Sequence, residues 1–306
     1  MTAAAPGTAM EDRVLCGWRV RSAFALPELP PWSGAEDAPV DLCIVEAEVP
    51  DQLEDAVRAG PVLSIAGDGS VLVNVPGLLR MLIRDGRGVA VEVLEPSEDW
   101  KLYLLGTALG VLCHQRGLYP LHASAVGVNG RTVAIAGRSG AGKSTLALHL
   151  AGRGHLFQAD DVTVLRSAAG GLEVLPALPR MKLWRGSLDA AGVDAAMLPR
   201  VRQGVEKFYL EPGAGFDLAP SPLRAVILLE EAEQPSLVRL EPKQALAAVR
   251  PHVYRPRPGA VLQGRQRLFA HAAELVSSTP VFRLSRPKRF DDLPAIAALI
   301  EEAAGG

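Results

Sequence analysis

One short stretch constrains the fold more than any other: residues 132–151 combine an apolar run, a glycine-rich loop and a helix-forming segment. Residues 137–145 match the phosphate-binding loop (Walker A) pattern G-x-x-x-x-G-K-[ST] in full. The pattern is meaningful between a buried strand and a helix, and residues 132–136 and 144–151 have the composition of those two elements. We therefore expect an α/β core that binds a nucleoside triphosphate.

Composition and charge exclude several classes of protein. A chain of 306 residues, 48% hydrophobic and 22% charged, is typical of a globular protein with one large or two modest domains. A net charge of −2 gives no general electrostatic reason to bind nucleic acid or an anionic membrane. The three cysteines are far apart, which argues against a disulfide framework or a zinc site and for a reducing compartment. No apolar run reaches the roughly 20 residues of a membrane helix. We predict a soluble cytoplasmic protein with neither nucleic-acid nor membrane partners.

The pattern of apolar runs and turn residues divides the chain into three parts. Residues 1–12 are expected to be disordered, residues 13–96 to form a β-rich N-terminal domain, and residues 97–306 to form the phosphate-loop domain with C-terminal helices. The β-rich part is interpreted as a small antiparallel sheet that includes one strand over residues 14–21. Its hairpin turns are expected at residues 67–69 and 85–88.

Outside the loop region, periodicity predicts most of the remaining elements. A nearly all-apolar run predicts a central strand at residues 223–230. Helices are expected at residues 97–117, 187–192, 242–250, 259–277 and 291–304.

The loop itself supplies the candidate nucleotide-binding residues. Its glycines let backbone N–H groups approach phosphate oxygens, and the following helix N-terminus favours negative charge. Lys143 is expected to reach the β- and γ-phosphates, and the Ser144 hydroxyl to bind Mg²⁺. The candidate residues are Gly137, Arg138, Ser139, Gly140, Ala141, Gly142, Lys143, Ser144 and Thr145.

Two adjacent carboxylates, Asp160 and Asp161, follow the loop and stand near a strand end. Beside a nucleotide, one carboxylate can face the metal while the other accepts a proton from an attacking hydroxyl. The half-apolar lead-in at residues 155–159 is unlike that of a standard motor or transport ATPase. His122 stands at the start of the strand before the one that leads into the loop. Taken by itself, this residue is compatible with either a structural or a catalytic role.

Taken together, three segments resemble the HPr kinase/phosphorylase family: residues 121–126, the loop at 137–145, and residues 153–161 with R-G-H and A-D-D. The resemblance implies an α/β core of the HPr kinase/phosphoenolpyruvate carboxykinase type, ATP and Mg²⁺ as cofactors, and transfer of a phosphoryl group to a serine hydroxyl of a peptide or small protein. It implies catalytic roles for Asp160, His122 and Lys143, with Asp160 as the base and His122 paired to it. Asp161 would then support the metal together with Ser144. A homo-oligomer is left open.

Departures from the family pattern refine the resemblance. Thr145 stands where those enzymes tend to carry glutamate, and residues 179–184 replace their downstream signature segment. The chain is in this respect more similar to the HPr-kinase-related proteins of peptide-modification systems, of which lasso-peptide tail serine kinases are an example. The alternative is a nucleotide-binding regulatory or scaffold protein without transferase activity.

Basic residues that follow the loop region in the chain are candidates for contacting the substrates. Arg180, Lys182 and Lys207 could contact phosphates or an acidic acceptor, because charge stabilisation dominates phosphoryl transfer. Glu206 is a candidate second metal ligand. The cluster of basic residues at 283–289 is interpreted mainly as a solvated face or helix-end support, with peptide recognition as the lesser alternative.

Overall fold

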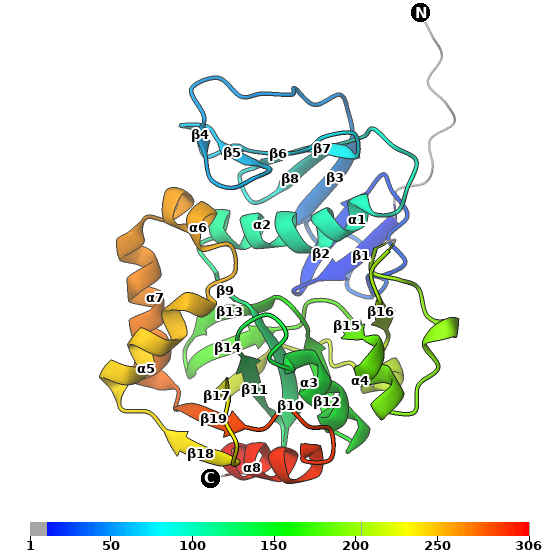
Figure 1. Ribbon diagram of the computed structural model, residues 1–306. Coiled ribbons are helices and arrows are strands. Elements are labelled where there is room, and N and C mark those ends of the chain that lie inside the picture. The colour runs from blue at the N-terminus through cyan, green and yellow to red at the C-terminus, as the bar shows by residue number, and fades with distance from the viewer. Residues whose placement is uncertain (1–10, 203, 306) are drawn as a thin grey trace, which may run out of the picture. The chain divides into compact units, whose positions relative to one another are not determined.

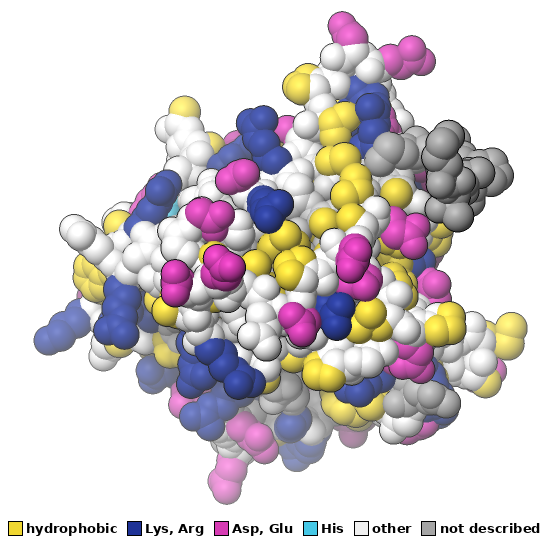
Figure 2. Space-filling model, turned by 90° about the horizontal axis from the view of Figure 1, so that it is seen from above, with side chains coloured by type: hydrophobic (Ala, Val, Ile, Leu, Met, Phe, Trp, Pro, Cys, Tyr) yellow, Lys and Arg dark blue, Asp and Glu magenta, His cyan; other side chains and the backbone are white. Residues whose placement is uncertain are grey.

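The computed structural model describes residues 11–202 and 204–305, and these form two compact units (Figure 1). Unit 1 contains the described residues up to Gly117 together with Arg257–Gly264. Unit 2 contains Leu118–Pro256 and the described residues from Arg265 onward. Acidic and basic side chains are interspersed on the face seen in Figure 2, as the nearly balanced charge of the chain implies.

Unit 1 is built on one sheet of eight strands in the order β1-β2-β3-β8-β7-β6-β5-β4. β3 runs parallel to both of its neighbours, while the other pairs are antiparallel. The predicted purely antiparallel sheet is therefore wrong, because the long connection over residues 23–41 lets β3 return in the direction of β2. The strands are β1 (Glu11–Leu15), β2 (Trp18–Ser22), β3 (Leu42–Glu46), β4 (Val57–Arg58), β5 (Leu63–Ile65), β6 (Val71–Val75), β7 (Leu79–Arg84) and β8 (Gly88–Val93).

The turns of this sheet test the sequence interpretation residue by residue. The hairpins predicted at residues 67–69 and 85–88 are confirmed, joining β5 to β6 and β7 to β8. The single strand predicted over residues 14–21 is wrong, because Cys16 and Gly17, at φ of 55° and 75°, form a tight turn between β1 and β2. Residues 1–10 of the predicted disordered segment lie outside the described residues, and residues 11–12 belong to β1.

The helix predicted over residues 97–117 is present as α1 (Trp100–Leu102), the π-helical η1 (Tyr103–Ala108) and α2 (Leu109–Gln115). It is bound to the sheet of unit 1: the Gln115 side chain donates to two carbonyls of that sheet region, and Arg116 donates to two more. The division of the chain therefore falls at Gly117 rather than after residue 96.

Unit 2 contains a nine-stranded sheet and a separate hairpin. The main path is β12-β10-β11-β17-β14-β13-β9, with β19 paired to both β17 and β18. β17 lies between β11 and β19 and runs parallel to both, which confirms the predicted central strand. The strands are β9 (Tyr119–Leu121), β10 (Ala123–Val128), β11 (Arg131–Ala136), β12 (Leu156–Ala159), β13 (Thr163–Ala168), β14 (Gly171–Leu175), β17 (Ser221–Glu231), β18 (Ser236–Arg239) and β19 (Val281–Arg286), with the hairpin β15 (Met181–Trp184) and β16 (Lys207–Leu210).

Two helices, α3 and α8, share a core with this sheet (green and red in Figure 1). Leu146 and Leu150 of α3 and Ile300 of α8 are fully buried against Ile135 of β11 and Ile227 of β17. This packing sets the position of the loop between β11 and α3. The helical elements of unit 2 are α3 (Lys143–Gly152), α4 (Arg185–Ala190), η2 (Ala195–Met197), η3 (Gly213–Gly215), α5 (Pro242–Val249), η4 (Arg250–His252), α7 (Arg265–Ser278) and α8 (Leu293–Gly305). Between η4 and α7 lies α6 (Pro256–Leu262), which belongs to unit 1 except for its first residue.

Several predicted helices differ from the observed ones in their bounds, and the helix expected over residues 187–192 is observed two residues earlier, as α4. The helix expected over residues 259–277 is interrupted at Gly264, whose φ of 82° is left-handed, so that α6 and α7 are separate. The closing helix begins at Leu293 instead of residue 291. Every helix within the described ranges is too short or too polar to cross a lipid bilayer.

The segment Arg153-Gly-His155 ties the end of α3 to α8. The Arg153 guanidinium donates from Nε and one Nη to the two carboxylate oxygens of Glu301, at 2.7 and 2.8 Å. Nε2 of His155 lies 2.8 Å from the same carboxylate. The hydrogen bond from Arg153, followed by that from His155, lowers the pKa of Glu301 from its ordinary 4.5 to about 2. The R-G-H segment therefore has a packing role in this fold.

We expect Glu301→Gln to lower the Tm at pH 7 and to lose that effect in acid. A carboxyl whose folded-state pKa is lowered stabilises the protein above its unfolded-state pKa, and that contribution disappears as the pH falls from about 4.5 toward about 2. Thermal unfolding across this range measures the effect. The exposed neighbour Glu302, changed to glutamine, is the control, and an equal loss in both variants would contradict the assignment.

Candidate active site

The glycine-rich loop occupies residues 137–142, between β11 and the first residue of α3, Lys143. Gly140 and Gly142 have left-handed backbones, with φ of 77° and 92°. A Cβ on Gly142 would collide with the guanidinium of Arg286, which donates to the Ala141 carbonyl at 2.8 Å. The left-handed backbone favours glycine at both positions, and the nearness of Arg286 favours it at position 142 as well. The loop therefore has the open backbone that close approach of a phosphate demands.

The Lys143 side chain lies folded against the loop. The residue is 7% exposed, and its ammonium donates to the carbonyls of Gly137 and Arg138 at 3.1 and 3.3 Å. Nζ also lies 3.1 Å from Nε2 of His122. Burial lowers the pKa of Lys143, although Asp160 and Asp161 oppose that shift. The ammonium is thus held at the loop, beside the histidine.

Two interruptions in neighbouring strands bring the histidine and the aspartates together. His122 separates β9 from β10, and residues 160–162 separate β12 from β13. β9 pairs with β13 and β10 pairs with β12, both antiparallel, so the two interruptions face one another. Residues 39 positions apart in the chain therefore meet: Nδ1 of His122 lies 3.0 Å from the Asp161 carbonyl oxygen.

Asp160 is 5% exposed and accepts hydrogen bonds from three donors. Its Oδ1 accepts from the hydroxyls of Ser124 and Ser144, at 2.6 and 2.8 Å, and its Oδ2 accepts from the backbone N–H of Lys182 at 2.8 Å. The contact with Ser144 joins this carboxylate to the hydroxyl that the loop pattern assigns to Mg²⁺.

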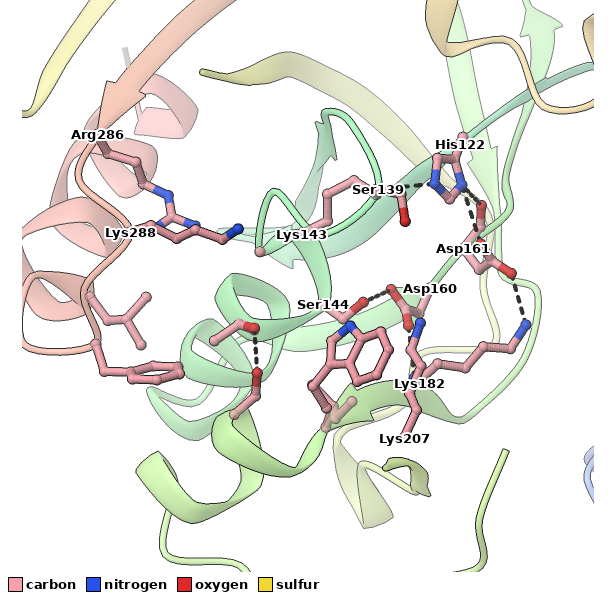
Figure 3. Close-up of a pocket in the computed structure, with 18 of the residues that line it drawn as sticks. His122, Ser139, Lys143, Ser144, Asp160, Asp161, Lys182, Lys207, Arg286 and Lys288 are labelled. Atoms are coloured by element: carbon pink, nitrogen blue, oxygen red, sulfur yellow. Dashed lines mark hydrogen bonds and ion pairs between the residues drawn. The ribbon is translucent and has the colours of Figure 1, made fainter. Parts of the chain in front are cut away.

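Asp161 points to a different set of partners. Its Oδ1 lies 3.2 Å from Nδ1 of His122, and its Oδ2 accepts from the Lys182 ammonium at 2.8 Å (Figure 3). Burial acts to raise the pKa of Asp161, but the hydrogen bond from His122 and the Lys182 ammonium outweigh it and hold this pKa well below its ordinary value. The expected pairing of His122 with Asp160 is wrong: the histidine contacts Asp161, because the left-handed backbone at Asp161, φ 71°, turns the second carboxylate away from the first.

The three other predicted basic residues lie in different surroundings. Lys182 contacts both aspartates, as described above. Lys207 lines the same cavity, with its ammonium 5.6 Å from the centre of the Trp184 ring. Arg180 lies over the Tyr209 ring, 3.8 Å from its centre, and is not among the described residues that line the cavity. Glu206 forms ion pairs with Arg185 and Arg200, which occupy the carboxylate considered as a metal ligand.

A cavity of about 390 Å³ joins these groups. From the predicted loop residues it is lined by Ser139, Gly140, Gly142, Lys143, Ser144 and Thr145, while Gly137, Arg138 and Ala141 line a second cavity of about 820 Å³. The two cavities share His122, Ser139, Gly140, Arg286 and Lys288.

Three basic residues of the cavity come from the end of β19 and the segment that follows it: Arg286, Lys288 and Arg289. The interpretation of this cluster as a solvated face is wrong for the buried Arg286. It holds for Lys288 and Arg289, which are exposed, and Arg289 pairs with Asp292 next to the start of α8. Arg286 is 5% exposed, and burial lowers its pKa. A signal was present in the sequence, since the cluster directly follows an apolar strand, but only the parallel pairing of β19 with β17 brings it to the loop.

The charges of the cavity favour a polyphosphate with a divalent cation. Six cationic side chains line it (Lys143, Lys182, Lys207, Arg286, Lys288 and Arg289), against the two carboxylates Asp160 and Asp161. Within the described residues, no group of three or more His, Cys, Asp or Glu side chains could hold a metal by itself. Mg²⁺ needs no such cage, because it commonly binds through one or two protein oxygens together with substrate phosphates. Ser144 and Asp160 fit that requirement.

Comparisons with known proteins agree with the family resemblance. No family model matches the chain. An HPr kinase/phosphorylase from Chlorobium luteolum is 42% identical over 80 residues, which cover 26% of this chain and 23% of the relative. The enzyme of the same name from Chlorobium phaeovibrioides is 37% identical over 100 residues, which cover 32% and 29%. The chain thus matches less than a third of the length of these curated relatives.

A solved structure, the HPr(Ser) kinase/phosphatase from Coxiella burnetii, is 15% identical to this chain. The match covers 60% of this chain and 92% of the Coxiella chain. Its TM-score of 0.34 is too low to establish a shared fold. The predicted resemblance to an HPr kinase-like family is confirmed by the curated relatives, over the part of the chain that they match.

Gly142→Ala is expected to weaken binding of Mg·ATP at least about tenfold. Alanine at this position is strained in the left-handed backbone by on the order of 1–2 kcal/mol, and its Cβ displaces the end of the Arg286 side chain. The loop relieves that strain by leaving the conformation that phosphate binding needs, which weakens the affinity by a comparable free energy. Isothermal titration calorimetry measures the affinity. Gly152→Ala, where a Cβ meets nothing within 4 Å, is the control and should bind as the parent does. Unchanged affinity in Gly142→Ala would contradict a phosphate-binding role for the loop.

Proposed function

Because the chain resembles HPr kinase/phosphorylases over part of its length, we propose that it is an ATP-dependent phosphotransferase. It transfers the γ-phosphate to a serine-type hydroxyl of a peptide or small protein. One observation carries the proposal: adjacent carboxylates face one cavity, Asp160 bonded to the loop hydroxyl of Ser144 and Asp161 held by His122 and Lys182. That is the division of labour that phosphoryl transfer to a hydroxyl needs.

The loop and the cationic side chains bind the nucleotide. Lys143 exchanges its contacts with the loop carbonyls for the β- and γ-phosphates, a short movement because its ammonium already lies at the loop. Ser144 and Asp160 would hold Mg²⁺, which would neutralise charge on the phosphates. Arg286 and Lys288 stabilise negative charge on the nucleotide from the opposite side of the loop (Figure 3).

We assign the two aspartates in the opposite way from the resemblance, which implied Asp160 as the base and Asp161 at the metal, because His122 contacts Asp161 and Ser144 contacts Asp160. Asp161 accepts the proton of the acceptor hydroxyl. As the hydroxyl oxygen bonds to the γ-phosphorus, the bond from that phosphorus to the β,γ-bridging oxygen breaks, ADP leaves, and the proton passes to the Asp161 carboxylate. His122, 3.2 Å from Oδ1, orients this carboxylate. His122 also lies against Lys143, so the base and the phosphate-binding ammonium share one positioning residue.

The acceptor reaches His122 from the second cavity. That cavity is the larger of the two, and it shares His122, Arg286 and Lys288 with the first. Its walls carry charges of both signs, including Arg138, Glu231 and the ion pair that Arg283 forms with Glu230 at 3.1 Å. A peptide segment that presents a serine fits this arrangement better than a small neutral metabolite, because several charged side chains are available along its length.

The proposal is tested with γ-labelled ATP and a library of serine-containing peptides. Label is expected on a subset of the peptides and absent from the matching serine-to-alanine peptides. Tight nucleotide binding without transfer to any acceptor would favour a regulatory or scaffold protein instead. Label released only as inorganic phosphate would indicate a hydrolase.

Asp161→Asn is expected to lower kcat by about 10²- to 10⁴-fold while leaving Mg·ADP affinity close to the parent value, because it removes the proton acceptor but keeps the shape of the side chain. Asp160→Asn should instead raise the Mg²⁺ concentration needed for half-maximal binding of nucleotide. Steady-state kinetics and calorimetry separate the two effects. Full transfer activity in Asp161→Asn would exclude it as the base.

Lys182→Met is expected to move the acidic limb of the kcat/KM profile to higher pH. The Lys182 ammonium helps to hold the pKa of Asp161 below its ordinary value, against the effect of burial. Its loss raises that pKa, so the carboxylate is protonated, and inactive as a base, at a higher pH than in the parent. The backbone N–H that Asp160 uses is kept.

The matched control for this profile is Lys207→Met, which removes another cavity ammonium that has no contact with Asp161 among the hydrogen bonds of the described residues. It should leave the acidic limb in place. A purely structural role for Lys182 would lower activity at every pH without moving the limb.

A further inference from the structure

The cavity that holds the aspartates also has an apolar part. Phe290 and Leu293, from the segment that follows β19, line it together with Leu183 and Trp184. Leu293 is 8% exposed, but Phe290 is 47% exposed. An aromatic ring that stays half-exposed in a cavity beside a phosphate-binding loop keeps a surface that a flat ligand can cover.

The two ends of the cavity differ in chemistry. His122 and Asp161 lie on one side of the loop, and Arg286 and Lys288 lie on the other (Figure 3). With the γ-phosphate directed to His122 and Asp161, the α-phosphate and the nucleoside extend toward the other side. Phe290, which also lines the cavity, follows Lys288 by two residues in the chain. Thr145 of α3 also lines the cavity, with its hydroxyl 2.8 Å from that of Ser187.

We propose that Phe290 stacks on the base of the bound nucleotide and that this enzyme accepts adenine and guanine nucleotides alike. The inference rests on the proposed function, since it assumes that the loop binds a nucleotide. Among the described residues lining this cavity, Asp160 and Asp161 are the only carboxylates and no carboxamide is present. The Ser187 hydroxyl, which lines the cavity, can donate or accept a hydrogen bond and so suits either purine, and Arg289 is paired with Asp292. Stacking is equally tolerant, because every base has a π-face.

Phe290 is a better stacking partner than Trp184, the other exposed aromatic ring among the described residues that line the cavity. The Trp184 ring already has the Lys207 ammonium 5.6 Å from its centre, and the two residues are register partners in the β15–β16 hairpin. Gly186 lies beside the tip of the Phe290 ring, where a Cβ would be 4.0 Å from Cζ. A glycine at this position leaves that side of the ring free of a side chain from residue 186.

Calorimetry on the full chain tests the proposal with three probes in the presence of Mg²⁺: ADP, GDP and pyrophosphate, which has no base. The parent should bind ADP and GDP within about tenfold of each other. Phe290→Ala should weaken both nucleotides by about tenfold or more and leave pyrophosphate within about twofold, because stacking of a base is lost and the phosphate contacts remain. Phe290→Trp should restore nucleotide affinity.

Phe269→Ala is the matched control, because Phe269 is also 47% exposed and lies on α7, outside the residues lining the cavity. It should change none of the three affinities. Three outcomes would overturn this inference and leave the proposed function standing. They are unchanged nucleotide affinity in Phe290→Ala, an equal loss of pyrophosphate binding in that variant, and a preference of the parent for one base above about 100-fold. If the parent binds neither nucleotide nor pyrophosphate, the proposed function fails, and the inference fails with it.

Discussion

The left-handed backbone of Asp161 separates two adjacent carboxylates onto two sets of partners, and the rest of the candidate site depends on that turn. In a regular strand, neighbouring side chains point to opposite faces of the sheet, and only one of them could face the loop. Here both line the cavity, one bonded to Ser144 and the other to His122. Lys182 contacts both, through its backbone N–H and its ammonium, so a single residue holds the pair in place.

A second constraint is the convergence of three parallel strands on the loop. β11 leads directly into it, β17 lies beside β11, and β19 lies beside β17 and ends at Arg286. Arg286 then donates to a loop carbonyl, and Lys288 and Phe290 follow it into the cavity. The end of β19 and the segment after it thus bring cationic side chains and an aromatic ring to the cavity beside the loop, although about 145 residues of chain separate Arg286 from the loop.

Much of the architecture could be predicted because the elements concerned carry local signals. The loop pattern, the all-apolar run of β17 and the turns at residues 67–69 and 85–88 each depend on residues adjacent in the chain. One error has a local cause: a non-glycine residue with a positive φ hides the turn at Cys16-Gly17 inside an apolar run. Other errors have non-local causes, since the parallel placement of β3 depends on how a long connection returns. The association of the 100–115 helix with the N-terminal sheet depends on partners far away in sequence.

The order and spacing of residues, visible without coordinates, were enough to predict a glycine-rich loop of the phosphate-binding pattern with a histidine and two aspartates nearby. The sequence could not decide which aspartate faces the histidine. That depends on a single backbone torsion at Asp161 and on the pairing of β9 with β13 and of β10 with β12. Nor could it bring Arg286 and Phe290 to the loop, because strand order in a sheet is set by packing among distant segments rather than by local composition.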